Sequence, residues 1–570
     1  MIRKLIQSEK GLILVAGFLI FISRCLLIYF MDGPFVYADE MGYWSHAANM
    51  AGLQWSIDGT SWYSYGYSLF LVPLFWISHN MYFVYKLALL LNAIAGVISF
   101  IICYDISKRL SHNINHIVLA AISVLVIMYP SFLAQSYIAW SETILYLFIW
   151  ILFWLMIRFE ENQNIVSSFL IGFTLGFIYL IHNRTIGVLI AYCMIGLVWS
   201  FMKRIDWRYY TISIVVMVTI LIGSGWFKKL IAVKYVKNFE DAVISGNGMA
   251  SIFEKLQTFT PIEAIETLFL SVSGQVWYLL AATGLLIFWG IVMCVSQIKN
   301  RKQSFFHGFV LLALAGTMGI SGIWWMNLSN ISTQETVRVD GLFYGRYNEC
   351  VLGIFLLLGL LYLAQMQIEK KNVILFIIGS IILFVTGLIL SGQMVHIEKF
   401  YVQSCSVFAL EYYRWFGQFS AIICTGIAFV LALILFLSMS NRKNGFGEKV
   451  FVKIVVCCIC IVFWGLTGLQ GTRSFTMVEQ RFTKQYNELF DYVKELQADR
   501  VYIYGTYKEA ADMQTRIVDS EVVRVNNECM EIEENGYLVL ENEAVRQLDL
   551  SEFESCFEAL NYTVYRKVAE

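Results

Sequence analysis

Long runs of apolar residues, separated by short polar segments, dominate the chain from its start to about residue 470. A run of about 18 or more apolar residues can cross the hydrocarbon core of a bilayer as one α-helix. We count about thirteen runs of this length, which predict a polytopic α-helical membrane protein. The runs lie near residues 10–30, 82–104, 116–133, 140–158, 164–181, 185–202, 209–227, 267–296, 305–327, 350–368, 373–391, 418–440 and 451–469.

Lysine and arginine residues predict the orientation of these helices. In short loops these cations favour the cytoplasmic side of the membrane. With the N-terminus in the cytoplasm, every predicted cytoplasmic loop contains at least one of them, as in Lys108–Arg109 and Lys370–Lys371. An odd number of crossings then places the C-terminus outside. The long connection 31–81, which includes a short apolar piece at 66–77, is also predicted to lie outside.

The last hundred residues differ from the rest of the chain in their charge and in the spacing of their apolar residues. Residues 471–570 contain 20 acidic and 11 basic residues, a balance that argues against nucleic-acid binding. Apolar residues at every second position predict strands, and apolar residues three or four positions apart predict helices. The predicted strands are 501–505, 522–525, 537–540 and 562–568, and the predicted helices are 482–497 and 550–560. We therefore expect a transmembrane domain over 1–470 and a small extracytoplasmic α/β domain over 471–570.

The cysteines add little chemistry. Cys457, Cys458 and Cys460 lie inside the last apolar run, where cysteine acts as a small hydrophobic residue. Cys529 and Cys556 both lie in the predicted exported domain, where an oxidising compartment would permit a disulfide between them.

Two adjacent acids, Asp39 and Glu40, are the first candidates for chemistry. They follow the first apolar run, in a segment without lysine or arginine from residue 32 to residue 84. A carboxylate can act as a general base toward an attacking hydroxyl. The alternative is a solvated loop acid or a helix cap. Glu142 opens a later helix at the same predicted face, where the helix dipole alone would also favour an acid.

Several cations are predicted to lie in or near the outer leaflet. Arginine suits phosphate oxygens, and charges within a membrane usually face a cavity or an ionic partner. For those near helix ends, snorkelling to the interface is the alternative. The candidates for binding a lipid phosphate are Lys86, Arg184, Arg346 and Arg24.

Aromatic residues and one histidine accompany these charges and are candidates for an acceptor site: Tyr43, His46, Tyr65 and Tyr344. Motifs of other chemistries are missing from the sequence. There is no G-x-x-x-x-G-K-[ST] loop for a nucleotide, no H-E-x-x-H and no G-x-S-x-G. External acids with phosphate-seeking cations therefore favour a reaction on a phosphorylated lipid.

The segments Tyr37–Tyr43 (YADEMGY) and Tyr65–Pro73 (YGYSLFLVP) resemble the first external loop of GT-C fold glycosyltransferases. The closest group is that of protein O-mannosyltransferases and lipid A aminoarabinose transferases. Pro130–Thr143 is similar to the second external loop of that group, and Asn183–Thr185 to the basic start of a later helix. The run Tyr344–Glu349 resembles a feature of bacterial members.

The resemblance implies an inverting transfer of a hexosyl or pentosyl group from a polyprenyl-phosphate donor to an acceptor hydroxyl. The reaction would take place at the outer face of a bacterial cytoplasmic membrane, on an envelope glycan, a lipid or a protein. Asp39 would be the general base, and Glu40 would support it or position the acceptor. Glu142 would orient the acceptor or help to bind an ion. The lipid phosphate would be held by Lys86, Arg184 and Arg346.

Some members of this family use a divalent ion, and Asp39, Glu40 and Glu142 would be its ligands here. We expect neither a metal requirement nor another cofactor, because fixed cations can stabilise a phosphate leaving group.

Two other classes of protein stay open. A transporter of lipid-linked substrates would place its polar groups near the bilayer midplane and would contain paired repeats. An O-antigen ligase or polysaccharide polymerase would also use lipid-linked sugars, but would leave the Asp39–Glu40 pair unexplained.

Overall fold

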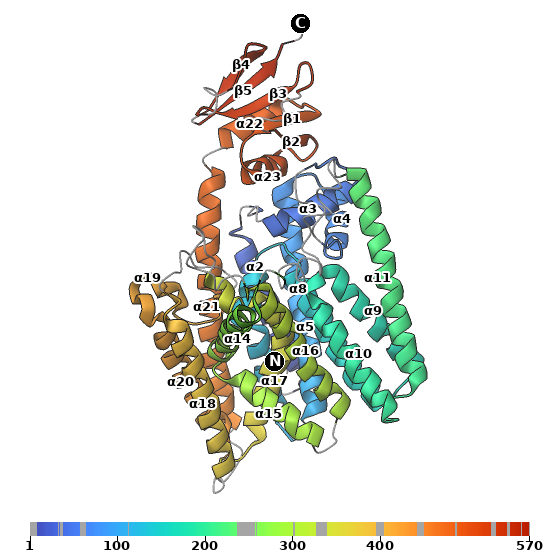
Figure 1. The fold of residues 1–570 in the computed structure, drawn as a ribbon, viewed down its shortest axis with the longest axis vertical. Helices are drawn as coiled ribbons and strands as arrows, with labels where there is room; N and C mark the ends of the chain where they lie inside the picture. Colours follow the sequence, from blue (N-terminus) through green and yellow to red (C-terminus); the bar gives the residue numbers. More distant parts are fainter. Residues whose placement is uncertain are drawn as a thin grey trace.

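The computed structural model describes residues 8–31, 33–34, 38–56, 64–111, 113–235, 257, 259–299, 303–326, 339–394, 404–441, 450–484, 487–525, 532–543, 548–559 and 561–568. Long helices form the main body, and a small sheet lies beyond one end of it (Figure 1). Helix α21 extends from the helical body toward the sheet.

Ten helices in the described part of the chain are long and apolar enough to cross a membrane. The chain is therefore a multi-pass membrane protein, as predicted. The helices are α5 (Met81–Leu110), α8 (Glu142–Glu161), α10 (Ile186–Phe201), α11 (Trp207–Tyr235), α14 (Pro261–Thr283), α16 (Ser304–Trp324), α17 (Arg346–Gln365), α18 (Lys370–Ser391), α20 (Ser420–Met439) and α21 (Val450–Lys484). Of these, α17 is the most deeply buried.

The predicted number of thirteen crossings is not confirmed. Several other predicted runs form shorter helices or a helix outside the ten: α2 (Glu9–Ile28), α6 (His116–Ile127), α7 (Pro130–Gln135) and α9 (Ile165–Ile181).

The prediction of one helix over 267–296 is wrong. Gly284 adopts a left-handed conformation with φ 54°, which ends α14, and α15 (Leu286–Lys299) starts two residues later. A glycine in this conformation is a common helix terminator.

The connection predicted to lie outside, which we call the first external connection, contains two helices, α3 (Ala38–Ala51) and α4 (Ser68–Ile77), which pack against each other. The predicted short apolar piece is α4, whose 10 residues are too few to cross a bilayer. The backbone N–H of Gly66 donates to the carbonyl of Leu180 at 2.8 Å, which attaches this connection to the end of α9. Ser68 Oγ donates to the carbonyl of Tyr43 at 2.9 Å and so joins the two helices.

The C-terminal domain is a five-stranded sheet with helices, which confirms the predicted α/β class. Its strand order is β2-β1-β3-β5-β4, where β1 is parallel to β2 and β3, and β5 is antiparallel to β3 and β4. The elements are α22 (Asn487–Glu495), β1 (Arg500–Tyr504), α23 (Tyr507–Arg516), β2 (Glu521–Val525), β3 (Tyr537–Glu541), β4 (Phe553–Glu558) and β5 (Tyr562–Lys567).

One predicted element of this domain is wrong in type, and one was missed. The segment predicted as a helix over 550–560 contains strand β4, because its backbone pairs with β5. Helix α23 was not predicted, although Thr506 and Glu509 form a capping box at its start. The domain division at 470 stays a prediction, and α21 continues through it to Lys484. Cys529 lies outside the described residues, so its pairing with Cys556 also stays a prediction.

The turn between α23 and β2 contacts the first external connection. Trp55 Nε1 donates to the carbonyl of Val518 at 2.9 Å, and His79 lies 2.5 Å from a carboxylate oxygen of Asp519. These contacts place the C-terminal domain at the end of the helical body where α3 lies (Figure 1).

The replacement Gly66→Ala tests the attachment of the first external connection. A Cβ atom at Gly66 would lie 2.5 Å from the backbone carbon of Leu180, so one of the two segments must move. We expect the free energy of unfolding to fall by about 1–3 kcal/mol. Thermal unfolding in detergent micelles measures this effect.

Gly426→Ala is the matched control, because a Cβ atom at Gly426 in α20 meets nothing within 4 Å. Equal stability of the two variants would show that Gly66 does not hold this connection in place.

Candidate functional site

Four helix starts meet at the candidate site. Asp39 lies in the first turn of α3, Glu142 is the first residue of α8, and Arg346 is the first residue of α17. Arg184 lies in the short helix η1 (Asn183–Thr185), which leads into α10. Helix starts favour acids and disfavour cations. The two arginines are therefore expected to need acids as partners.

The four side chains form one chain of ion pairs. Arg346 donates from Nη1 to Asp39 and from Nε to Glu142. Arg184 Nη1 donates to the same Glu142 oxygen, Oε1, at 3.0 Å. The structure thus brings together Asp39, Glu142, Arg184 and Arg346, all predicted as site residues.

Burial differs sharply along this chain. The side chain of Glu142 is 0% exposed, that of Arg184 is 2% exposed and that of Arg346 is 6% exposed, whereas that of Asp39 is 28% exposed. Asp39 is therefore the member that a solute approaching from outside can reach.

Aromatic rings lie against both guanidiniums. The Arg346 guanidinium carbon lies 4.3 Å from the centre of a Trp140 ring, and that of Arg184 lies 5.9 Å from the Tyr347 ring. A ring face attracts a cation without using its N–H donors. These donors therefore stay available for oxygen ligands.

Three of these donors are buried without an acceptor among the described residues: Nη2 of Arg346, and Nε and Nη2 of Arg184. Leaving a buried charged donor unsatisfied is costly. Guanidinium forks match the spacing of phosphate oxygens. The arrangement is thus suited to an oxyanion such as a phosphate.

Glu40 follows Asp39 in the sequence but points to a different partner. It is fully buried, and its Oε1 accepts the backbone N–H of Ala139 at 3.1 Å. This bond holds α3 against the connection that leads into α8. The two adjacent acids therefore have different partners: Asp39 accepts from Arg346, and Glu40 accepts from Ala139.

Tyr43 connects α3 to Glu142 through Ser141. The Tyr43 hydroxyl donates to Ser141 Oγ at 2.9 Å, and Ser141 Oγ donates to Glu142 Oε2 at 3.4 Å. Burial, and then the charges of Glu142 and Asp39, raise the pKa of Tyr43 well above its ordinary value. The phenol therefore stays protonated and acts as a donor.

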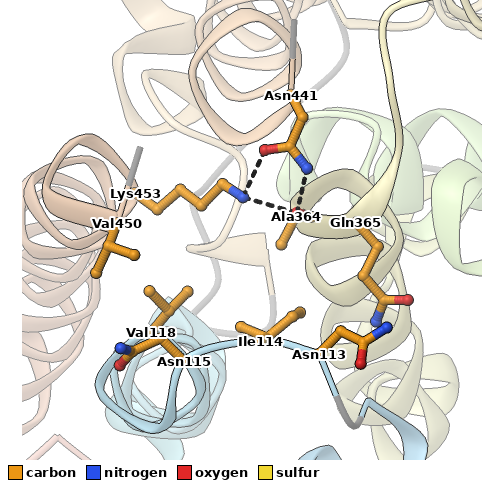
Figure 2. Close-up of a pocket in the computed structure, with 9 residues that line it drawn as sticks. All are labelled: Asn113, Ile114, Asn115, Val118, Ala364, Gln365, Asn441, Val450 and Lys453. Atoms are coloured by element: carbon orange, nitrogen blue, oxygen red, sulfur yellow. Dashed lines mark hydrogen bonds between the residues drawn. The ribbon is translucent and has the colours of Figure 1, made fainter. Parts of the chain in front are cut away.

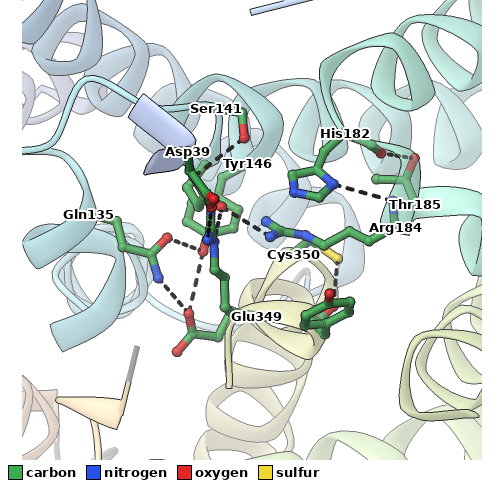
Figure 3. A network of polar contacts seen from close by, with 12 residues as sticks. Asp39, Gln135, Ser141, Tyr146, His182, Arg184, Thr185, Glu349 and Cys350 are labelled. Carbon is green, nitrogen blue, oxygen red and sulfur yellow. Dashed lines mark hydrogen bonds and ion pairs between the residues drawn. The ribbon is translucent and has the colours of Figure 1, made fainter. Parts of the chain in front are cut away.

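His182 precedes Arg184 by only two positions. Its Nδ1 accepts the backbone N–H of Arg184 at 3.3 Å (Figure 3). Burial, and then the charges of Arg184 and Arg346, lower the pKa of His182 well below its ordinary value. The ring is therefore neutral and can accept this bond.

Glu349, three positions after Arg346 on α17, is the centre of a second group of buried polar side chains. It was not predicted as a site residue. Glu349 is fully buried and accepts hydrogen bonds from Ser131 Oγ at 2.5 Å, from Gln135 Nε2 at 2.7 Å and from the hydroxyl of Tyr278. Gln135 also accepts from Tyr146 at 2.8 Å (Figure 3).

Gly345 makes room for this group. A Cβ atom at Gly345 would lie 2.1 Å from ring atoms of Tyr278. The glycine before Arg346 therefore allows Tyr278 to reach Glu349. The run Tyr344–Glu349 contained this signal, because a glycine next to a buried charge often marks a close approach.

Two predicted phosphate ligands, Lys86 and Arg24, make no hydrogen bond or ion pair with the four residues of the ion-pair chain. Lys86 is half-buried on α5 and makes no hydrogen bond or ion pair with any described residue. Arg24 is buried in α2, where its Nη2 lies 3.5 Å from the carbonyl of Ile127 and its guanidinium faces Gly96. Their roles in phosphate binding stay predictions.

The remaining acceptor candidates lie in different surroundings. The Tyr65 hydroxyl donates to the carbonyl of Ser224 at 3.2 Å, on α11. His46 is buried on α3. The Tyr344 ring packs against Tyr347 with 5.8 Å between ring centres, and so lies near Arg184. Tyr43 and Tyr344 are thus the candidates that contact the surroundings of the ion pairs.

The three predicted metal ligands fit a divalent ion poorly. Glu142 accepts from two guanidiniums, Asp39 accepts from one, and Glu40 accepts a backbone N–H. Among the residues with a described position, no group of three His, Cys, Asp or Glu side chains is placed to hold a metal.

A separate cavity of about 220 Å³ lies at the far end of α17 (Figure 2). There Lys453 Nζ donates to the carbonyl of Ala364 at 2.7 Å and to Asn441 at 3.0 Å. Gln365, which ends α17, lines this cavity, whereas Arg346 starts the same helix. A helix of 20 residues is about 30 Å long, so this cavity is not part of the ion-pair site.

The helical body, helix α3 and the C-terminal domain together have the fold of the GT-C class, which confirms the predicted resemblance. The chain is similar to the solved structure of ArnT from Cupriavidus metallidurans bound to undecaprenyl phosphate. The two share 12% identity and a TM-score of 0.52, over 97% of this chain and 98% of that one. For the apo state of the same ArnT the identity is 13% and the TM-score 0.51, over 96% and 97%.

The arabinosyltransferase EmbB from Mycobacterium smegmatis matches at 11% identity and a TM-score of 0.40, over 83% of this chain and 41% of that one. No sequence-family model matches the chain, and no curated protein sequence matches it.

The replacement Glu142→Gln tests the electrostatic basis of the site. It leaves two buried guanidiniums with one partly exposed carboxylate, so we expect the free energy of unfolding to fall by about 3–5 kcal/mol. Glu161→Gln is the control at the other end of α8, where Glu161 forms an exposed ion pair with Arg109. That change is expected to cost less than about 1 kcal/mol. Thermal unfolding in detergent measures both, and similar losses would contradict the proposed role of Glu142.

Proposed function

We propose that the protein is a membrane glycosyltransferase that transfers a sugar from a polyprenyl-phosphate donor to an acceptor hydroxyl, with inversion at the sugar. The observation that carries this proposal is a partly exposed carboxylate, Asp39, beside two buried guanidiniums with unsatisfied donors. The GT-C fold supports it, because the similar ArnT structure contains undecaprenyl phosphate.

The two arginines would hold the phosphate of the donor. Arg184 and Arg346 together offer three buried N–H groups that have no acceptor in the described part of the chain. The phosphate becomes the leaving group when the sugar is transferred, and fixed cations stabilise the charge that it gains. Lys86 and Arg24 stay further candidates for contacts with the lipid-linked phosphate.

Asp39 would act as the general base. The acceptor oxygen forms a bond to the anomeric carbon of the sugar, while the bond from that carbon to the phosphate oxygen breaks. The acceptor proton passes to the Asp39 carboxylate, and the polyprenyl phosphate leaves with the bonding electrons. Asp39 can then return the proton to solvent, because its side chain is 28% exposed.

Glu142 and Glu40 would hold other groups in position and would not accept the proton of the acceptor hydroxyl. Glu142 is completely buried between the two arginines, so it fixes the positions of their guanidiniums. Glu40 holds α3 against the backbone of Ala139 and so fixes the direction of Asp39. Both carboxylates would thus fix the positions of the charged side chains of the site before the reaction begins.

The acceptor would be a hydroxyl of an envelope glycan, a lipid or a protein at the outer face of a bacterial cytoplasmic membrane. The contact between Trp55 and Val518 supports a common side for the site and the C-terminal domain. The location of that side outside the cell rests on the distribution of lysine and arginine in the loops. The aromatic side chains of Tyr344 and Tyr347 offer apolar faces for a sugar ring.

The replacement Asp39→Asn tests the general base. It keeps the shape of the side chain but removes its ability to take a proton, so we expect sugar transfer to fall by about 10²- to 10⁴-fold. The assay follows release of polyprenyl phosphate from a polyprenyl-phosphate sugar by purified protein in detergent. Asp491→Asn, an exposed acid on α22, is the control with an expected wild-type rate. Wild-type transfer by folded Asp39→Asn protein would disprove the role of Asp39.

Chelation tests whether the arginines replace a metal. If fixed guanidiniums supply the positive charge, the initial rate of transfer stays unchanged after treatment with EDTA and gel filtration. A loss of activity that Mg²⁺ or Mn²⁺ restores would instead show that a divalent ion takes part.

A further inference from the structure

Arg346 is shared between two carboxylates with different tasks. Its Nε donates to Glu142, its Nη1 donates to Asp39, and its Nη2 is the buried donor without an acceptor among the described residues. The same guanidinium is the proposed ligand of the donor phosphate. One side chain thus connects the proposed base to the proposed phosphate site.

The charges of the ion-pair chain are balanced in this structure. Arg184 and Arg346 contribute two positive charges, and Glu142 and Asp39 contribute two negative charges. A phosphate that enters the same place brings at least one more negative charge. Like charges repel strongly in a poorly solvated site. Binding is therefore favoured if one carboxylate leaves its arginine.

The two carboxylates differ in how easily they can leave. Glu142 is completely buried and accepts from both arginines, so its release would leave a buried anion unpaired. The Asp39 side chain is 28% exposed and accepts from Arg346, and it can turn toward water. Asp39 is consequently the carboxylate that a phosphate displaces at lower cost.

We propose that Asp39 holds Nη1 of Arg346 in the free protein, and that the phosphate of the incoming polyprenyl-phosphate donor, which enters at the open Nη2, displaces Asp39 from this guanidinium. The proposal rests on the proposed function of the site and adds an order of events. The Asp39 carboxylate becomes available to an acceptor hydroxyl only after the donor has bound. The donor therefore binds before the acceptor.

A binding measurement on the full-length protein tests the displacement. The probe is undecaprenyl phosphate, titrated into wild-type protein and the Asp39→Asn variant in detergent micelles, with thermal unfolding as a check on folding. If Asp39 competes with the phosphate for Arg346, Asp39→Asn binds the probe about 2- to 5-fold more tightly, the scale of one partly exposed ion pair. Unchanged or weaker binding by folded Asp39→Asn protein overturns the proposal.

A double-mutant cycle shows whether the gain acts through Arg346. We expect Arg346→Gln to weaken probe binding, and Asp39→Asn to add nothing in the Arg346→Gln background. A gain that persists without Arg346 reflects only the loss of a negative charge and overturns the displacement. Asp491→Asn is the control, because Asp491 is an exposed acid on α22 and contacts no arginine of the ion-pair chain. Equal gains in Asp491→Asn and Asp39→Asn would overturn the proposal for the same reason.

The binding and transfer assays separate this inference from the proposed function. Loss of transfer by Asp39→Asn without tighter probe binding overturns the displacement and leaves the general base in place. Tighter probe binding with transfer intact overturns the general base and leaves the competition for Arg346 in place.

Discussion

Glu142 accepts hydrogen bonds from the guanidiniums of both Arg184 and Arg346 in a region without solvent contact. Two cations at the starts of helices, surrounded by apolar side chains, are unfavourable unless an acid lies between them. This requirement fixes how α8, η1 and α17 approach one another. It also leaves one side of the Arg346 guanidinium to a third partner, which is Asp39 in this structure.

The polar side chains around Glu349 support this cluster through neutral hydrogen bonds and not through ion pairs. Its carboxylate is satisfied by neutral hydroxyl and amide donors, such as those of Tyr278 and Gln135, rather than by a cation. Glu349 lies three positions after Arg346 on α17, so the two side chains leave the same face of the helix. Holding the Glu349 side chain in place therefore also restricts the direction of Arg346. The absence of a Cβ atom at Gly345 is what lets Tyr278 reach this position.

Much of the site could be predicted from sequence, because charged residues at the ends of apolar runs stand out. Asp39 and Glu142 were identifiable since both lie at the same predicted membrane face. Glu349 was not, because the side chains that surround it come from segments up to 218 residues away. The break at Gly284 was readable as a helix terminator within an apolar run. The segment 553–558 was not readable as a strand, because pairing with β5 decides its conformation.

Helix α3 joins the fixed and the adjustable parts of the site. Near its C-terminal end, Asn49 exchanges two hydrogen bonds with the backbone of Trp55, both at 2.9 Å, and Trp55 in turn donates to Val518 of the C-terminal domain. At its start, Asp39 is the one partly exposed member of the ion-pair chain. Glu40 holds the same helix near its start by accepting from the backbone of Ala139, so α3 is attached at both ends, one of them beside Asp39. The C-terminal domain therefore contacts the segment that follows α3 through the backbone carbonyl of Val518.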